Sequence, residues 1–140
     1  TNSIITPWVQ YTPTFAELGT VTTINFWSRR VEGELEIVGK FTTGTVTANN
    51  ATITIGYNGT SANVSSDTSV NPSLEVCGNM GVSYASVIQI YALIDSNTTL
   101  MNVGAQSVGR AGLAATSGTA AFGSAALVTL HATIPVTTWP

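Results

Sequence analysis

Hydrophobic and polar residues alternate over short runs of this chain, as they do in strands that bury one face. No window keeps apolar residues at the three-four spacing of a helix, and Thr, Val and Ile fill the runs. Clusters of Gly, Asn and Ser separate them. The pattern predicts strands at Trp8–Tyr11, Val21–Arg30, Glu34–Phe41, Thr45–Thr47, Ala51–Ile55, Leu74–Cys77, Val87–Ile94, Leu100–Val103, Ser117–Phe122 and Leu127–Val136.

This number of short strands in 140 residues predicts one all-β domain over residues 1–140. The expected architecture is a jelly-roll-like antiparallel β-sandwich.

The most clearly patterned element is a hairpin with its turn at Glu32-Gly33. Pairing residues outward from this turn gives one mostly apolar face, which we expect to pack on the core. On it Arg30, Ser28, Phe26 and Ile24 lie opposite Leu35, Ile37, Gly39 and Phe41. The other face is mostly polar and pairs Arg29 with Glu36, Trp27 with Val38 and Asn25 with Lys40.

Four side chains of this hairpin carry specific expectations. Arg29 and Glu36 should form a cross-strand ion pair on the polar face. The ring of Phe26 should cover the bare backbone of Gly39. Arg30 shares the apolar face near its rim, so its side chain either extends outward to solvent or meets a partner chain.

A second signal is the run "SVIQIYALI", from Ser86 to Ile94, which is largely apolar on both faces. In a sandwich one face of each sheet normally meets water, so the outer face of this strand needs a cover. Two covers remain open, another subunit or a loop of the same chain. The first predicts an oligomer.

Composition removes several function classes. Only 8% of the residues are charged, four of them basic, and the net charge is −3, so nucleic acid is not an expected partner. No apolar run approaches the roughly 20 residues of a membrane span. Cys77 is the only cysteine, so no internal disulfide can form. We attribute the four N-x-S/T sequons, at Asn50, Asn58, Asn63 and Asn97, to the Asn- and Thr-rich composition.

No residue set predicts catalysis. The single histidine, His131, lies on the Thr-rich face of a strand without a nucleophile of its own. Glu34 and Glu36 have a spacing that a glycosidase pair can use, but Glu36 is accounted for by Arg29. Zinc needs clustered His and Cys, and calcium ligands have no motif here. We therefore expect no enzyme activity, no cofactor and no metal.

Binding remains, and the sequence predicts a long polar loop at "GYNGTSANVSSDTSVNPS", from Gly56 to Ser73. Sugars bind to an aromatic platform flanked by amide and carboxylate groups. The stretch supplies Tyr57 as platform and Asn58 and Asp67 as hydrogen-bond partners. If the site lies elsewhere, the outer face around Trp27 or a groove between subunits is expected to hold it.

Three segments together resemble a domain found at the C-terminal ends of bacteriophage tail fibres and related virion proteins. The first two carry the pattern W-x-x-Y-T-P-T-F, then G-T-V, an aromatic-x-R-R-V hairpin and G-x-F-x-x-G-T-V. The third is an I-P strand followed by Trp. They read "WVQYTPTF" at Trp8–Phe15, "GTVTTINFWSRRVEGELEIVGKFTTGTVTA" at Gly19–Ala48 and "ATIPVTTW" at Ala132–Trp139.

The resemblance implies a homotrimeric β-sandwich on the virion, the C-terminal fragment of a longer fibre protein. Such a domain adheres outside the cell to a bacterial surface polysaccharide, in the capsule or lipopolysaccharide, and does not insert into a membrane. Two other classes stay open. One is a carbohydrate-binding module of a glycan-degrading enzyme, and the other is a purely structural trimerisation cap of a virion fibre.

Overall fold

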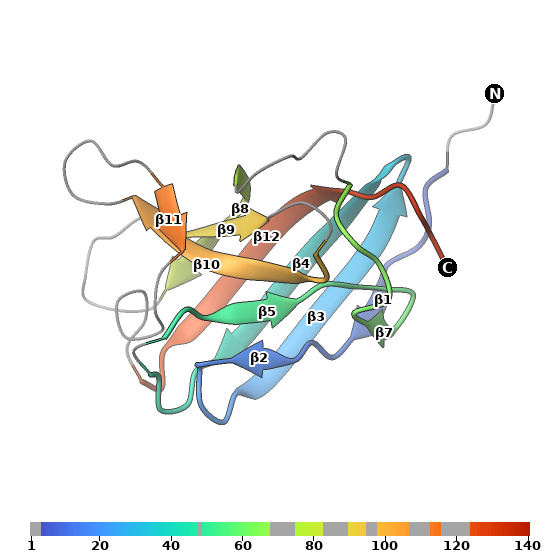
Figure 1. Cartoon of the computed structure of the whole chain (residues 1–140). Helices are drawn as coiled ribbons and strands as arrows, with labels where there is room; N and C mark the ends of the chain where they lie inside the picture. Colours follow the sequence, from blue (N-terminus) through green and yellow to red (C-terminus); the bar gives the residue numbers. More distant parts are fainter. Residues whose placement is uncertain are drawn as a thin grey trace.

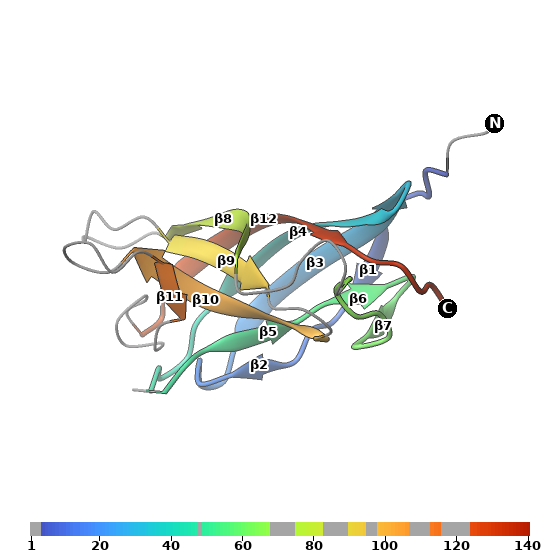
Figure 2. The same cartoon turned by 45° about the horizontal axis from the view of Figure 1, so that its top comes forward.

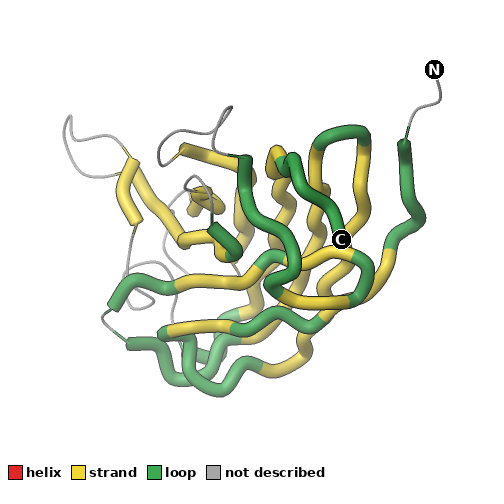
Figure 3. The backbone as a smooth tube through the Cα atoms, turned by 45° about the vertical axis from the view of Figure 1, so that its right-hand side comes forward, coloured by secondary structure: helices red, strands yellow, loops and turns green. Residues whose placement is uncertain are grey.

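The computed structural model of the protein describes residues 4–47, 49–67, 75–82, 90–94, 98–106, 113–115 and 124–140. Strands and loops make up these residues, and none of them lies in a helix (Figure 3), which confirms the all-β prediction. The strands are β1 (Val9–Tyr11), β2 (Phe15–Ala16), β3 (Thr22–Val31), β4 (Glu34–Thr42), β5 (Thr52–Thr54), β6 (Gly56–Tyr57), β7 (Thr60–Ser61), β8 (Glu75–Val82), β9 (Ile90–Ile94), β10 (Leu100–Gln106), β11 (Leu113–Ala115) and β12 (Leu127–Pro135).

One antiparallel sheet contains nearly all of these strands. Its hydrogen-bonded order is β1-β3-β4-β12-β8-β9-β10-β5-β2, with β11 on β10, and β6 and β7 form a separate hairpin. The sheet curls like a half-barrel, so that β5 and β2 pass in front of β3 and β4 (Figures 1 and 2). The jelly-roll-like sandwich and the trimer stay predictions.

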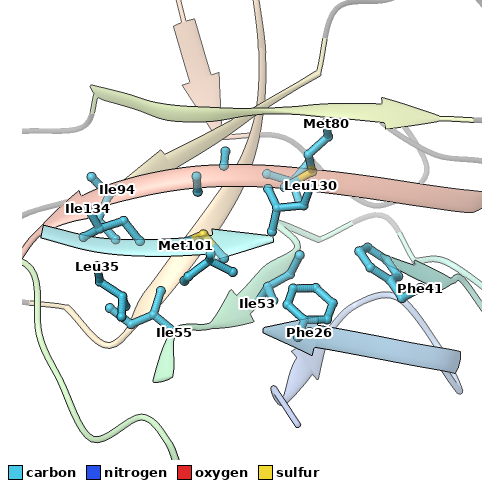
Figure 4. Packing of buried hydrophobic residues seen from close by; sticks show 14 of the residues in the cluster. Phe26, Leu35, Phe41, Ile53, Ile55, Met80, Ile94, Met101, Leu130 and Ile134 are labelled. Carbon is cyan, nitrogen blue, oxygen red and sulfur yellow. The ribbon is translucent and has the colours of Figure 1, made fainter. Parts of the chain in front are cut away.

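The concave side of the curl holds the core. Figure 4 shows side chains from both halves of the sheet meeting there, with Phe26 and Phe41 facing Ile53 from the opposite half. The core-facing residues of β12 are Val128, Leu130, Ala132 and Ile134, every second residue of the strand. Burying one apolar face along each long strand explains why alternation dominates the sequence.

The segment from Tyr11 to Phe15 connects the two open edges of the sheet. It leaves β1 at one edge and enters β2 at the other. The buried hydroxyl of Tyr11 donates a hydrogen bond to the carbonyl of Thr54 (3.1 Å), and the backbone of Thr14 bonds Thr54 in both directions (2.8 and 3.1 Å). The ring centroid of Phe15 then lies 5.7 Å from that of Phe26 and 4.8 Å from that of Phe41. The Y-T-P-T-F part of the W-x-x-Y-T-P-T-F pattern thus links the two edges of the curled sheet.

The β3–β4 hairpin has the predicted register from its turn to the pair of Asn25 with Lys40. Glu32 begins the turn with a φ of 56°. A Cβ on Gly39 would run into the ring of Phe26, which confirms that this ring covers the glycine. The predicted pairing of Ile24 with Phe41 is wrong, because the register shifts between Thr22 and Asn25.

Several predicted strands differ from the structure. Thr45–Thr47 is wrong, because this stretch is a loop in which the amide of Thr47 donates to the carbonyl of Glu17. The predicted strand at Leu74–Cys77 instead continues to Val82 as β8. Short strands β2, β6, β7 and β11 were not predicted, since two or three residues give no readable alternation. Ser117–Phe122 and the first part of the Val87–Ile94 strand lie outside the described residues.

The described part of the doubly apolar strand is β9. Ile90, Ala92 and Ile94 face the core, and Leu93 on the opposite face is also fully buried within the single chain. The outer face of β9 therefore needs no second subunit at Leu93. Val87 and Ile88 lie outside the described residues, so for them the choice between the two covers stays open.

Candidate functional site

The three segments that carry the tail-fibre resemblance meet at the turn end of the β3–β4 hairpin. The guanidinium of Arg29 lies 4.5 Å from the ring centroid of Trp8, from the first segment. The guanidinium of Arg30 lies 4.5 Å from the ring centroid of Trp139, from the last segment. Cation–π contacts of this kind contribute about 0.5–1 kcal/mol at exposed sites. The adjacent arginines thus fasten both ends of the described chain to one hairpin.

Arg30 was expected either to extend outward or to meet a partner chain. In the single chain its side chain reaches the rim, where Nε donates a hydrogen bond to the carbonyl of Glu32 (2.7 Å) and the guanidinium stacks on Trp139. The outward orientation is therefore sufficient to explain its position on an otherwise apolar face.

Tyr57 lies beside the same end of the molecule, on the small β6–β7 hairpin. Asn58 (φ 54°) and Gly59 (φ 87°) form its turn, a conformation that Asn-Gly favours. The stretch from Gly56 is thus a hairpin at its start, where a loop was expected. Asn63 fixes it, because its side-chain amide bonds both the N–H and the carbonyl of Tyr57 (2.8 Å each).

The ring of Tyr57 is half-buried and meets the ring of Trp139 edge-on, with centroids 4.9 Å apart. It is therefore less open than the solvent-facing platform that the sequence predicts. Asn58 is exposed at the tip of the hairpin. Tyr57 and Trp139 together form a two-ring aromatic wall, to which the Arg30 guanidinium adds a third planar group.

Two hollows flank the C-terminal segment next to this wall, and Thr137 borders both. One has a volume of about 300 Å³ and is lined by polar loop residues, namely Ala62, Asn63, Val64, Ser65, Ser66, Thr137 and Thr138. The other, of about 640 Å³, combines apolar walls with three carboxylates and is lined by Val31, Glu32, Gly33, Glu34, Asp67, Pro135, Val136 and Thr137.

Asp67 lies in the wall of the larger hollow and is only 9% exposed. Its amide donates to the carbonyl of Pro135 (2.9 Å), which positions the residue against β12. The structure thus brings both residues to the segment Pro135–Trp139, Tyr57 against Trp139 and Asp67 against Pro135. It does not bring Trp27 to this site, since Trp27 lies on the outer face of the sheet.

On that outer face, Trp27 is 37% exposed and its indole N–H donates to the side-chain oxygen of Asn25 (2.8 Å). The same oxygen accepts a bond from the amide of Gln10 (3.2 Å). These two bonds fix the orientation of the exposed ring.

The carboxylate of Glu36 contacts two basic side chains on this face. Arg29 Nε lies 2.7 Å from one of its oxygens, which confirms the predicted ion pair, and His131 Nε2 lies 3.2 Å from the other. The hydrogen bond from Arg29, and secondarily that from His131, lowers the pKa of Glu36. A general acid needs a raised pKa, so these contacts do not suit Glu36 to that role.

Within the described ranges, no three His, Cys, Asp or Glu side chains gather as metal ligands. Nor does any helix there have the length and apolarity to cross a membrane. Comparisons with protein-family models, curated proteins and solved structures find no match.

The sequence did not single out Trp139, Thr137 or Asn63 as neighbours of the predicted site residues. Trp139 is 82 positions from Tyr57 along the chain (139 minus 57), and no local pattern relates them. The only signal was the closing Trp of the third family-like segment. Asn63 was visible merely as one asparagine among many in a polar stretch.

Proposed function

We propose that this protein is the receptor-binding tip domain of a bacteriophage tail fibre, which acts on the virion outside the cell and attaches it to a bacterial surface polysaccharide. The observation that carries the proposal is the pair of hollows next to the rings of Tyr57 and Trp139. Aromatic rings offer planar apolar surface to the C–H faces of sugars, while carboxylates, amides and hydroxyls bind their hydroxyl groups. Asp67, Asn63 and Thr137 supply such groups around the hollows.

The convergence of the family-like segments supports the same proposal. Residues that define the resemblance hold the structure together at this end, by Arg29 on Trp8 and Arg30 on Trp139. The loops between these segments are then the parts that vary with the receptor.

We further propose that the domain works as a homotrimer, with the two halves of the curl as layers of a jelly-roll-like sandwich. Ile4 and Ile5 support an assembly surface, since they are 45% and 60% exposed and pair with the end of β3. Exposed neighbouring isoleucines are typical of surfaces that another chain covers. The same observation keeps a trimerisation cap as the second candidate, because a cap needs the assembly surface without any sugar site.

The test removes the polar groups of the hairpin end without disturbing its backbone. Asn58→Gly keeps the positive φ of the turn, and Asp67→Asn keeps the shape of the buried side chain. The control is Thr45→Ala, an exposed substitution on a loop at the other end of β4. Binding is measured to immobilised capsular and O-antigen polysaccharides, and the oligomer mass by light scattering.

We expect the wild type and the control to retain at least one polysaccharide. The double variant should retain it at least tenfold less at an unchanged trimer mass. Wild-type trimers that retain no polysaccharide would favour the trimerisation cap. Equal retention by the double variant would move the site away from the hairpin end.

A further inference from the structure

A single row of cross-strand neighbours crosses the outer face of the sheet. Backbone pairing places its members opposite one another from strand to strand, through β1, β3, β4, β12, β8 and β9. The row reads Gln10, Trp27, Val38, His131, Asn79 and Tyr91. Each of the six is exposed or half-buried, in contrast to the buried residues on the inner face.

The row has the residue types and the dimensions of a binding site for an extended chain. We call this row of six residues the outer-face track. With strands about 4.8 Å apart, six strands span roughly 24 Å, and two spacings, roughly 10 Å, separate Trp27 from His131 and His131 from Tyr91. Rings thus alternate with amide and aliphatic side chains along the row. The spacing between the rings is about the length of one disaccharide. Such a repeat suits a linear glycan that lies across the strands.

The surface around Trp27 is preorganised. The side-chain oxygen of Asn25 accepts bonds from both Trp27 and Gln10, so the amide nitrogen of Asn25 is fixed beside the exposed ring. No described residue accepts a hydrogen bond from that nitrogen. A donor already oriented next to an aromatic platform costs little entropy when a ligand hydroxyl or carboxylate binds it.

A hollow between β12 and β8 makes the outer-face track concave at this place. It has a volume of about 420 Å³ and is lined by Asn79, Met80, Gly81, Thr129, Leu130 and His131. It therefore joins two members of the row to the adjacent row, in which Asn25, Lys40, Thr129 and Gly81 are cross-strand neighbours.

The charges of this region distinguish it from the hairpin end. Lys40 is exposed, lies one row from Trp27, and has no acidic partner among the described residues. Glu36, four residues from Lys40 on the same face of β4, is bound by Arg29 and His131. Glu34 is six residues from Lys40 along β4, roughly 20 Å away. In a chain of net charge −3, this part of the surface is therefore locally positive.

From the row, the fixed ring and the uncompensated lysine, we propose that the outer face binds a linear, carboxylate-bearing polysaccharide. Trp27 stacks on a sugar ring, Lys40 pairs with a sugar carboxylate, and Gln10, Asn25 and Asn79 bond its hydroxyls. This inference rests on the proposed function in that it specifies the chemistry of the receptor. It assigns the extended chain to a surface separate from the hollows beside Tyr57.

The experiment uses polysaccharides in matched pairs. Polygalacturonate, alginate and hyaluronate are each immobilised beside their methyl-esterified, uncharged forms, and retention of the whole protein is measured at low and high salt. We expect at least one acidic chain to be retained at least fivefold better than its ester. The preference should shrink as salt rises, because exposed charges are screened.

Variants then separate the contribution of the Trp27 ring to retention from the contribution of the Lys40 charge. Trp27→Ala should weaken retention of both forms at least tenfold. Lys40→Gln should abolish the preference while retention of the ester stays as in the wild type, and Lys40→Arg should restore it. Arg30→Gln is the matched control, since it removes the same charge at the hairpin end and should leave the preference intact.

Several outcomes would overturn the proposal. These are retention of no acidic chain, a preference that survives in Lys40→Gln, and wild-type retention by Trp27→Ala. A smaller oligomer mass for Trp27→Ala would identify this face as a contact between copies. The double variant Asn58→Gly, Asp67→Asn separates the two sites. If it alone loses binding, the outer-face track fails and the proposed function stands; if no variant matters because the wild type binds no glycan, both fail.

Discussion

The inner and outer faces of the β3–β4 hairpin consist of alternate residues of the same two strands, but packing constrains only one of them. On the inner face Phe26, Leu35 and Phe41 are fully buried, and the ring of Phe26 contacts three other aromatic rings. On the outer face the adjacent Trp27 is 37% exposed, and Lys40 is open to solvent. Neighbouring residues should therefore affect different properties, with stability depending on the inner face and binding on the outer face.

The largest effect should come from Phe26→Ala. The substitution removes a fully buried ring that lies 5.7 to 5.9 Å from Tyr11, Phe15 and Phe41, and these partners cannot fill the space without moving. Large-to-small changes of this type cost about 3–5 kcal/mol of unfolding free energy. Urea denaturation measures this cost, and a loss below about 1 kcal/mol would show that the inner face is not the core.

Gly39→Ala should have the next largest effect, although it adds only one methyl group. The new Cβ would run into the ring of Phe26, so the ring has to leave its place in the aromatic cluster. Overpacking a well-filled core typically costs about 1–3 kcal/mol. Gly33→Ala is the matched control, because a Cβ at this turn residue meets nothing within 4 Å. Equal melting temperatures for both variants would contradict the packing of Phe26 on Gly39.

On the outer face, Arg29→Ala should cost about 1 kcal/mol or less. It breaks a half-exposed ion pair with Glu36 and a contact with Trp8, each of which contributes little in water. The effect is measured by chemical denaturation beside Phe26→Ala. Comparable losses for the two would mean that the faces were assigned wrongly.

The pH dependence of that small effect has a defined sign. Because the folded state lowers the pKa of Glu36, the ion pair stabilises the fold above the ordinary value near 4.5. That stability is lost as the pH falls through the lowered pKa. The difference in unfolding free energy between wild type and Glu36→Gln should therefore shrink as the pH falls below 4.5 and vanish below the lowered pKa of Glu36. A difference that grows on acidification would contradict this assignment.

Ser28→Ala should have the smallest effect on stability, although Ser28 lies on the inner face of the hairpin. Ser28 is 1% exposed, and its hydroxyl has no hydrogen-bond partner among the described residues. Removing an unsatisfied buried hydroxyl relieves a desolvation cost, so the variant should be as stable as the wild type or about 1 kcal/mol more stable. A clear loss in a thermal melt would show that the hydroxyl has a bound partner.

The sequence predicted the hairpin well because its turn, alternation and length agree. From Glu32-Gly33 the period of two assigns every side chain to a face, and the pairs of Arg29 with Glu36 and Phe26 with Gly39 follow directly. It could not predict the bulge before Asn25, because an unpaired residue such as Thr23 leaves the composition of the strand unchanged.

The candidate site was less predictable because its parts are far apart in the chain. Tyr57 meets Trp139, and Asp67 meets Pro135, only after the sheet has curled. The row on the outer face likewise depends on the strand order, which places β8 between β12 and β9. Alternation shows which way each residue points, but it does not show which strand lies next to which.

The division between the two faces is tested most directly by a urea titration of Trp27→Ala with and without a retained acidic polysaccharide. Without it, the variant should unfold within about 1 kcal/mol of the wild type, since its ring is on the surface. At a free ligand concentration of 100 times the wild-type Kd, the wild type should gain about 2.7 kcal/mol by linkage, and the variant, which binds at least tenfold more weakly, about 1.4 kcal/mol or less. An equal gain in both proteins, or a variant destabilised as strongly as Phe26→Ala, would contradict the account.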